Sequence, residues 1–99
     1  MQYEVRTTAQ FETWHRTLDQ SIANRVARSI DRMRDGNLGH HSPIRGFPGV
    51  HERRETYGGG VRIYFARDGP ALIILLGGGD KSSQRRDIER AYQVWQSYQ

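Results

Sequence analysis

The sequence contains no cysteine and a single lysine, and each scarcity narrows what the chain can be. Without cysteine there is neither a disulfide scaffold nor a thiolate ligand for a metal. The four histidines lack the spacing of a zinc site, and His40-His41 is expected to lie in a polar loop. No apolar run approaches the roughly 20 residues of a membrane span, and the N-terminal pattern is not that of a signal peptide. We therefore expect a soluble cytoplasmic protein without metal or cofactor.

Arginine takes the place of the scarce lysine. All 15 basic residues except Lys81 are arginine, and the formal net charge is +4. The arginine side chain is a planar fork that matches phosphate groups and stacks on bases, whereas lysine is a point charge. The composition therefore favours a nucleic-acid-binding domain, although an ordinary solvated basic surface would give the same counts.

The residue pattern predicts one α+β domain over residues 1–99, with the element order β-α-α-β-β-β-α. The predicted elements are a strand over 3–6, a helix that carries Phe11, Trp14 and Leu18, a helix that ends at Gly36, strands over 50–57, 61–67 and 71–76, and a helix over 82–98. Residues 37–48 are expected to form a loop. The first two helices should form a hairpin against the apolar face of a largely antiparallel sheet.

Capping residues place the ends of the first two helices. Thr7, with Gln10 three residues later, has the spacing of a capping box. Ser21 is expected to cap the second helix, and Gly36 has the residue type typical of the position after a helix. The second helix has its apolar residues on one face, namely Ile22, Val26, Ile30 and Met33.

The segment from Ala71 to Gln84 carries the strongest local signal. An apolar run over 71–76 predicts a buried strand, and the glycines at 77–79 are expected to end it. Asp80 and Lys81 then open a helical pattern. A helix N-terminus has unpaired N–H groups and a partial positive charge, and Lys81 adds a full one. The segment therefore predicts an anion site, such as one for phosphate.

Alternation along the sheet gathers further cations. Val61, Ile63 and Phe65 should face the helices, which leaves Arg62 and Tyr64 on the other, open face. In an antiparallel meander Arg54 and Arg62 come near each other and near Lys81. Three cations beside one aromatic ring are an arrangement suited to phosphate and base.

The segments Gly49–Arg54, Tyr57–Phe65 and Leu76–Gln84 resemble the RelE/ParE toxin superfamily, and most closely its HigB-like "addiction module killer protein" branch. The resemblance implies a type II toxin that is neutralised by a helix-turn-helix antitoxin. RelE-like members cut mRNA, commonly on the ribosome and without metal, and leave a 2′,3′-cyclic phosphate. ParE-like members instead poison DNA gyrase.

The resemblance also implies residue roles. Arg62 matches the sheet arginine that holds the scissile phosphate, Arg54 matches the arginine of the family's Glu-Leu-Arg segment, and Lys81 falls where RelE-like enzymes have another cation. We expect these three residues to stabilise phosphate or leaving-group charge, and Tyr64 to stack on a base or to transfer a proton. The family's C-terminal tyrosine or histidine has no counterpart here at the start of the last helix.

The absence of that residue moves acid–base work to Tyr64, His51 or Asp80. Three of the candidate residues have a simpler alternative role: Tyr64 as a half-buried sheet aromatic, Asp80 as a plain helix cap, and Arg62 in an ion pair with Glu52. The candidates for RNA contact are Asp80, His51, Arg85 and Arg86. Arg85 and Arg86, together with Arg90, can equally form a solvated face or an antitoxin contact. Trp14 and Trp95 are expected to be core or antitoxin-contact residues.

Two charged residues depart from the branch's pattern. Arg53 and Glu55 stand where apolar residues are usual, on the face of the second strand that should point inward. Burying an unpaired charge is expensive. We therefore expect this strand to lie near a sheet edge, with both side chains partly exposed and paired.

Three functional hypotheses follow. The first is an mRNA endoribonuclease that halts translation, the second is a gyrase poison without nuclease activity, and the third is a degenerate toxin that only binds its antitoxin. The sheet cations favour the first, and the sparse acid–base residues favour the second.

Overall fold

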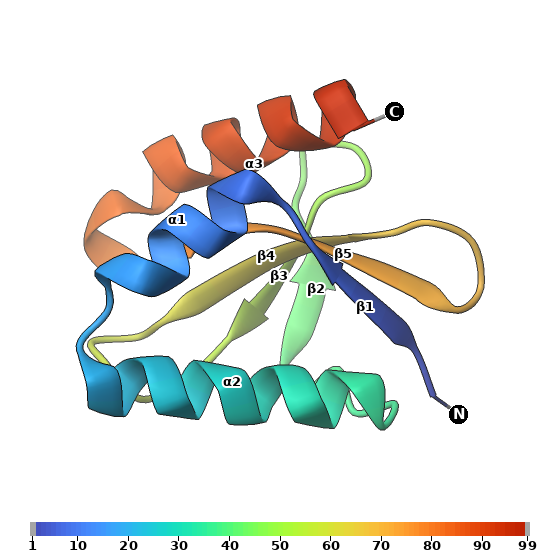
Figure 1. Cartoon of the computed structure of the whole chain (residues 1–99). Coiled ribbons are helices and arrows are strands. Elements are labelled where there is room, and N and C mark those ends of the chain that lie inside the picture. Colours follow the sequence, from blue (N-terminus) through green and yellow to red (C-terminus); the bar gives the residue numbers. More distant parts are fainter. Residues whose placement is uncertain (1, 99) are drawn as a thin grey trace.

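Within residues 2–98, the computed structural model contains five strands, three α-helices and one short 3-10 helix. In chain order they are β1 (Glu4–Thr7), α1 (Ala9–Thr17), α2 (Gln20–Arg34), β2 (His41–Pro43), β3 (His51–Arg54), β4 (Arg62–Arg67), β5 (Leu72–Gly79), η1 (Lys81–Ser83) and α3 (Gln84–Tyr98) (Figure 1). The predicted α+β class and the order of the predicted elements are confirmed, with β2 as an addition. None of the described helices is both long and apolar enough to cross a bilayer.

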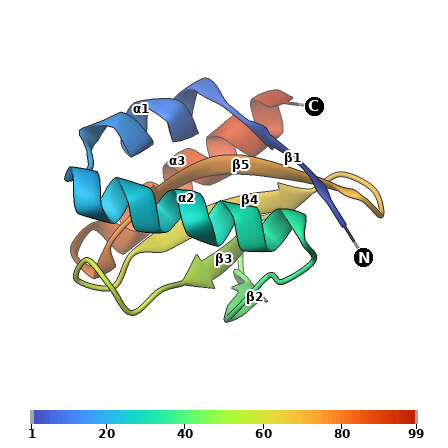
Figure 2. The same cartoon turned by 60° about the horizontal axis from the view of Figure 1, so that its bottom comes forward.

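The five strands form one sheet in the order β1-β5-β4-β3-β2. β1 runs parallel to β5, and the other three pairs are antiparallel. α2 and α3 lie on opposite sides of this sheet (Figures 1 and 2). The sheet is therefore the middle layer of the fold, and its two faces build two separate cores.

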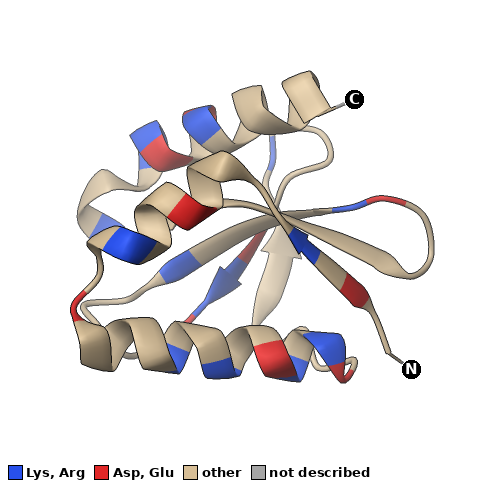
Figure 3. Cartoon of the chain, in the orientation of Figure 1, with Lys and Arg blue, Asp and Glu red and all other residues tan. Residues whose placement is uncertain are grey.

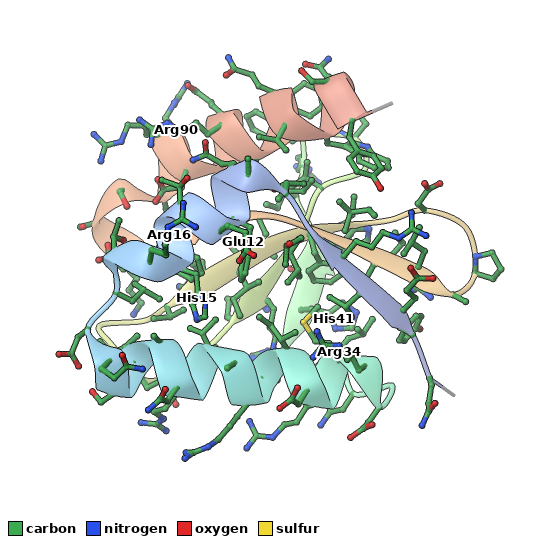
Figure 4. All side chains as sticks on the ribbon, in the orientation of Figure 1. Glu12, His15, Arg16, Arg34, His41 and Arg90 are labelled. Carbon is green, nitrogen blue, oxygen red and sulfur yellow. The ribbon has the colours of Figure 1, made fainter. Side chains whose placement is uncertain are left out.

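The first core lies between the sheet and the α1–α2 hairpin. It contains the apolar side of α2 predicted from its spacing, with Val26 and Met33 fully buried, and Phe11 from α1. Ile63 and Phe65 of β4 meet these helices, as the alternation predicted. His15 of α1 lies between the two helices, where its Nε2 is 3.0 Å from the Ala23 carbonyl oxygen (Figure 4).

The second core corrects the expectation of an open sheet face. Tyr64 points to the opposite side from Ile63, as predicted, and Ile74 lies on that side too, but α3 covers both side chains there. Ala91 of α3 is buried, and Trp95 packs against the same cluster. The amphipathic α3 needs an apolar partner, and the β4–β5 face supplies it.

Both N-caps lie one or two residues from the predicted positions. Thr8, and not Thr7, caps α1 by accepting a hydrogen bond from the Phe11 amide at 3.3 Å. Asp19, and not Ser21, caps α2 by accepting from the Ser21 amide at 3.1 Å. Thr7 is instead the last residue of β1, and Ser21 lies in the first turn of α2. The predicted end of α2 is confirmed, with Gly36 at a φ of 99°.

β2 lies inside the segment expected to be a loop, and it changes the environment of β3. Because β2 forms the sheet edge, β3 is not an edge strand and Arg53 is only 3% exposed. The expected pairing is confirmed, since Arg53 Nε lies 2.9 Å from Glu55 Oε1. The expected exposure of Arg53 is wrong. Its guanidinium also donates to the Asn37 carbonyl at 2.9 Å, which satisfies it inside the fold.

The three glycines at 77–79 do not end the strand, as had been expected, but form the last residues of β5. A Cβ on Gly78 would lie 2.5 Å from the Trp14 ring, and one on Gly79 would collide with the Asp87 side chain. The glycines therefore let α1 and α3 approach opposite faces of the strand. Trp14 and Trp95 are packing residues in the described structure.

His51 is expected to make the stability of the fold depend on pH. Burial lowers the pKa of this imidazole, and His41 and Arg67 lower it further. Below about pH 6.5 the unfolded chain takes up the proton more readily than the folded chain. The free energy of unfolding therefore decreases as the pH is lowered through that range. His51→Phe keeps an aromatic ring next to Phe65, on which His51 stacks at 5.3 Å, but removes the titration.

We expect wild type to lose more unfolding free energy than His51→Phe between about pH 7.5 and about pH 5.5. Urea denaturation of both proteins at the two pH values measures this difference. Equal losses in the two proteins would show that protonation of His51 does not contribute to the pH dependence of stability.

Candidate functional site

An open groove of about 570 Å³ brings together the three cations predicted to converge. Arg54 comes from β3, Arg62 from β4, and Lys81 from η1. The other lining residues are His40, Glu55, Thr56, Gly59 and Gly60. Figure 3 shows the basic segments of β3 and β4 near the ends of these strands.

Strand register sets the spacing of this site. Arg54 is directly opposite Arg62, and Arg62 is opposite Gly79. On the other side, the Arg54 amide donates to the His40 carbonyl at 2.8 Å, which continues the β2–β3 ladder by one residue. Directly opposite residues point to the same sheet face. His40, Arg54 and Arg62 therefore form one cross-strand row, with neighbours about 5 Å apart.

Arg62 is held in place yet keeps donor capacity. It is 7% exposed, and its Nη1 donates to the Gly60 carbonyl at 3.0 Å. Its Nε has no hydrogen-bond partner and lies 3.7 Å from Glu52 Oε1. The alternative reading of Arg62, an ion pair with Glu52, is thus present, but at a distance that leaves the Nε–H unsatisfied.

Glu52 is the buried anion behind these cations. Its Oε2 lies 3.1 Å from Arg54 Nη1, and its Oε1 accepts from Gln84 Nε2 at 2.8 Å. The second carboxylate near the groove, Glu55, is paired with Arg53. Arg54, Arg62 and Lys81 therefore have the carboxylate of Glu52 as their counter-charge, and the groove keeps a positive excess suited to an anion.

Lys81 completes the site from the end of β5. Its stem lies over Gly60, where an added Cβ would be 3.1 Å from Lys81 Cε. Among residues 2–98 it has no ion pair, and its side chain is exposed. Lys81 is therefore a solvent-exposed charge of the groove, beside two arginines that Glu52 contacts.

Tyr64 is placed differently from the expectation of an accessible stacking or proton-transfer residue. The side chain is fully buried beneath α3, and its hydroxyl has no hydrogen-bond partner in the described structure. Burial and the nearby carboxylates of Glu52 and Asp87 raise the pKa of Tyr64 above its ordinary value. Arg62 opposes this rise without reversing it, so the phenol stays protonated and inaccessible. Tyr64 is thus a packing residue of the sheet, as its alternative role stated, but it is fully buried and not half-buried.

The other predicted site residues lie outside the groove. His51 stacks on Phe65 and so belongs to the opposite sheet face. Asp80 is a helix cap, which was its alternative role: its side chain accepts a hydrogen bond from the Ser82 amide at 2.8 Å, at the start of η1. Hydrogen bonds from Ser82 lower the pKa of Asp80. Its carboxylate thereby occupies the turn at which an anion site had been expected.

Two basic surfaces flank the groove. Arg85 and Arg86 are exposed at the start of α3, where Arg85 Nε lies 3.4 Å from Glu89 Oε1. The second surface consists of the exposed residues Arg25, Arg28 and Arg32 on α2, which line a hollow that shares Glu55 and Thr56 with the groove. Figure 3 shows this basic side of α2 turned away from the sheet.

Sequence reasoning missed His40 and the α2 surface. The α2 arginines were visible at helical spacing off the apolar side, which was the available signal. His40 had no such signal, because its place in the groove depends on the β2–β3 ladder. Among residues 2–98 no three histidine or acidic side chains gather as they would around a metal ion.

The fold is that of RelE toxins. The backbone is similar to a chain of the toxin–antitoxin complex RelBE2 of Mycobacterium tuberculosis, with a TM-score of 0.70 and 18% identity over 82% of this chain and 100% of that chain. It is also similar to a mutant of the Escherichia coli toxin RelE in the free state, with a TM-score of 0.65 and 12% identity over 91% of this chain and 98% of that chain. The predicted RelE/ParE-like fold is confirmed.

In sequence, the chain is 35% identical over 92 residues to an uncharacterised protein of Haemophilus influenzae. The matched region covers 92% of this chain and 91% of that protein. The chain belongs to the same protein family as this Haemophilus protein. No protein-family model matches the chain, and its place in the HigB-like branch stays a prediction.

Neighbouring glycines offer a matched test of the groove. Gly59 and Gly60 both have positive φ, at 74° and 88°, so alanine is strained at either position. Only at Gly60 would the new Cβ press on Lys81, because nothing lies within 4 Å of the Cβ position at Gly59. We expect Gly60→Ala to weaken binding of a short single-stranded RNA about tenfold, or ~1.4 kcal/mol, more than Gly59→Ala does.

Fluorescence anisotropy measures the RNA affinity, and thermal melting checks that both variants lose similar stability. If the two variants bind RNA equally, the position of Lys81 over Gly60 is irrelevant to anion binding.

Proposed function

We propose that the protein is the toxin of a type II toxin–antitoxin pair and that it cleaves mRNA. The observation that carries this proposal is the shared groove of Arg54, Arg62 and Lys81. The RelE-like fold supports it, because both structural neighbours are described as a toxin or as a toxin–antitoxin complex. Ribosomes and mRNA place such an activity in the cytoplasm.

The groove cations divide two tasks in phosphodiester cleavage between them. Attack by the 2′-oxygen of ribose gives a phosphorane with a second negative charge, which fixed cations stabilise. The guanidiniums of Arg54 and Arg62 meet the non-bridging phosphate oxygens, for which their forked donors are suited. Lys81 reaches the departing 5′-oxygen. These fixed charges do the electrostatic work that a metal ion does elsewhere, and we therefore propose a metal-free reaction.

The basic surfaces on either side of the groove suit the remainder of the bound RNA. Arg85 and Arg86 on one side, and the α2 arginines on the other, can each bind backbone phosphates. Phosphate contacts of this kind fix register without reading sequence. We propose that mRNA on the ribosome is the substrate, and that a helix-turn-helix antitoxin, the type implied by the family resemblance, blocks this basic surface.

A gyrase poison is the alternative. Its support is the position of the expected acid–base residues, since Tyr64 is buried, Asp80 caps η1 and His51 lies on the other face. A groove with cations alone would bind nucleic acid without cutting it. Loss of supercoiling by purified gyrase, with translation intact, would establish this alternative.

Primer extension on mRNA after brief induction tests the nuclease. We expect wild type to produce new 5′ ends, and Lys81→Ala and Arg62→Ala to reduce the cleavage rate about 10²–10³-fold, because each removes charge from the phosphorane. Arg67→Ala is the matched control, since Arg67 lies on the same strand but contacts Tyr3 at the far end. Arg62→Lys, which keeps the charge beside Glu52, separates loss of the fork from loss of the fold.

Equal cleavage by Lys81→Ala, Arg62→Lys and Arg67→Ala would remove the basis of this proposal. So would wild-type induction that yields no new 5′ ends on mRNA while translation continues.

A further inference from the structure

We propose that His40 is the general base of the cleavage reaction, an inference that rests on the proposed function. Cleavage needs a group that takes the proton from the 2′-hydroxyl. None of the residues singled out from the sequence for this work lines the groove: Tyr64 is buried and His51 faces the hairpin. His40 lines it, and imidazole is the side chain most often used for proton transfer.

The other titratable groups that face the groove have different tasks. Arg54 and Arg62 stay protonated and so cannot accept a proton. Glu55 is engaged, since it accepts hydrogen bonds from Ser29 Oγ at 2.7 Å and from Arg53 Nε at 2.9 Å. Lys81 is the ammonium at the other end of the groove. His40 is therefore the one lining side chain, among those described, that is both basic and unengaged.

Backbone contacts fix the position of His40. Its carbonyl accepts the Arg54 amide at 2.8 Å, which holds it in the cross-strand row with Arg54 and Arg62. The preceding Gly39, at a φ of 64°, lies against the guanidinium of Arg53, where a Cβ would be 2.7 Å from Arg53 Cζ. The buried Arg53–Glu55 pair thus supports the turn that presents His40. A proton-transfer group needs such a fixed place relative to the phosphate.

The row has the order that displacement at phosphorus requires. His40 lies at the β2 end, the two arginines lie in the middle, and Lys81 lies beyond β4 at the end of β5. A phosphate on the arginines then has His40 on one side and Lys81 on the other. The attacking and departing oxygens of an in-line reaction also lie on opposite sides of the phosphorus.

Two proton transfers accompany the displacement at phosphorus. The neutral His40 imidazole takes the 2′-hydroxyl proton while the 2′-oxygen bonds to phosphorus. The bond from phosphorus to the 5′-oxygen breaks, and the Lys81 ammonium gives a proton to that oxygen. The products are a 2′,3′-cyclic phosphate and a 5′-hydroxyl, and solvent later restores both side chains.

Neighbouring histidines supply the matched pair of variants, His40→Gln and His41→Gln. His41 lies on the opposite sheet face, where its ring is 6.1 Å from Phe65 (Figure 4). The assay is single-turnover cleavage of a short synthetic mRNA on purified ribosomes, from about pH 5 to about pH 9. We expect His40→Gln to slow cleavage about 10²–10⁴-fold and to lose the decline in rate at acidic pH, while His41→Gln keeps both rate and profile.

Two further measurements separate proton transfer from structure. An oligonucleotide with a 2′-deoxy cleavage site should bind wild type and His40→Gln with the same affinity, and added imidazole should restore part of the rate of His40→Ala. A substrate with sulfur in place of the 5′-oxygen has a leaving group that needs no proton, so it should rescue Lys81→Ala but not His40→Gln.

The inference is overturned if His40→Gln keeps the wild-type rate and acidic decline, or if it loses RNA binding as much as cleavage. Rescue of His40→Gln by the sulfur substrate would also overturn it, by making His40 an acid. In each case wild type still cleaves the unmodified mRNA, and Lys81→Ala still cleaves it more slowly than wild type. By contrast, absence of cleavage by wild type counts against the proposed function itself.

Discussion

The buried carboxylate of Glu52 organises the end of the sheet on which the site depends. It contacts Arg54 of β3 and Arg62 of β4, and it accepts a hydrogen bond from Gln84 of α3. One anion shared by two guanidiniums holds both in place without cancelling both charges. A flexible arginine would have to lose side-chain freedom when an anion binds. Here that ordering belongs to the folded state, and donors already in position are the more effective ones for charge that develops during a reaction.

Sequence periodicity predicted the sides of the sheet correctly but not what covers them. It placed Ile63 and Tyr64 on opposite faces, and both do lie there. The burial of Tyr64 depends on α3, and alternation within a strand carries no information about a distant helix. The three-residue β2 has no strand pattern of its own and exists through pairing with β3. Glycines at 77–79 are compatible with a turn and also with a strand against which other side chains pack closely. Only the positions of Trp14 and Asp87 in the fold distinguish the two.

The candidate site shows the same division. The convergence of Arg54, Arg62 and Lys81 could be predicted because register along a meander follows from alternation and turn length. The place of His40 could not, because it depends on one hydrogen bond from the Arg54 amide across to an unrecognised strand. Arg53 illustrates the physical reason: a charge on an inward position was expected to need solvent, whereas the fold satisfied it with Glu55 and a carbonyl group.

The parallel pairing of β1 with β5 has a consequence for how the chain is made. Residues 4–7 pair with residues 72–75, so β1 leaves the ribosome well before its partner strand β5 has been made. Contacts between such distant positions slow folding, because a long loop must close before they form. Lys81 lies two residues after the end of β5, so the row of cations assembles only after this partner strand of β1 has been made.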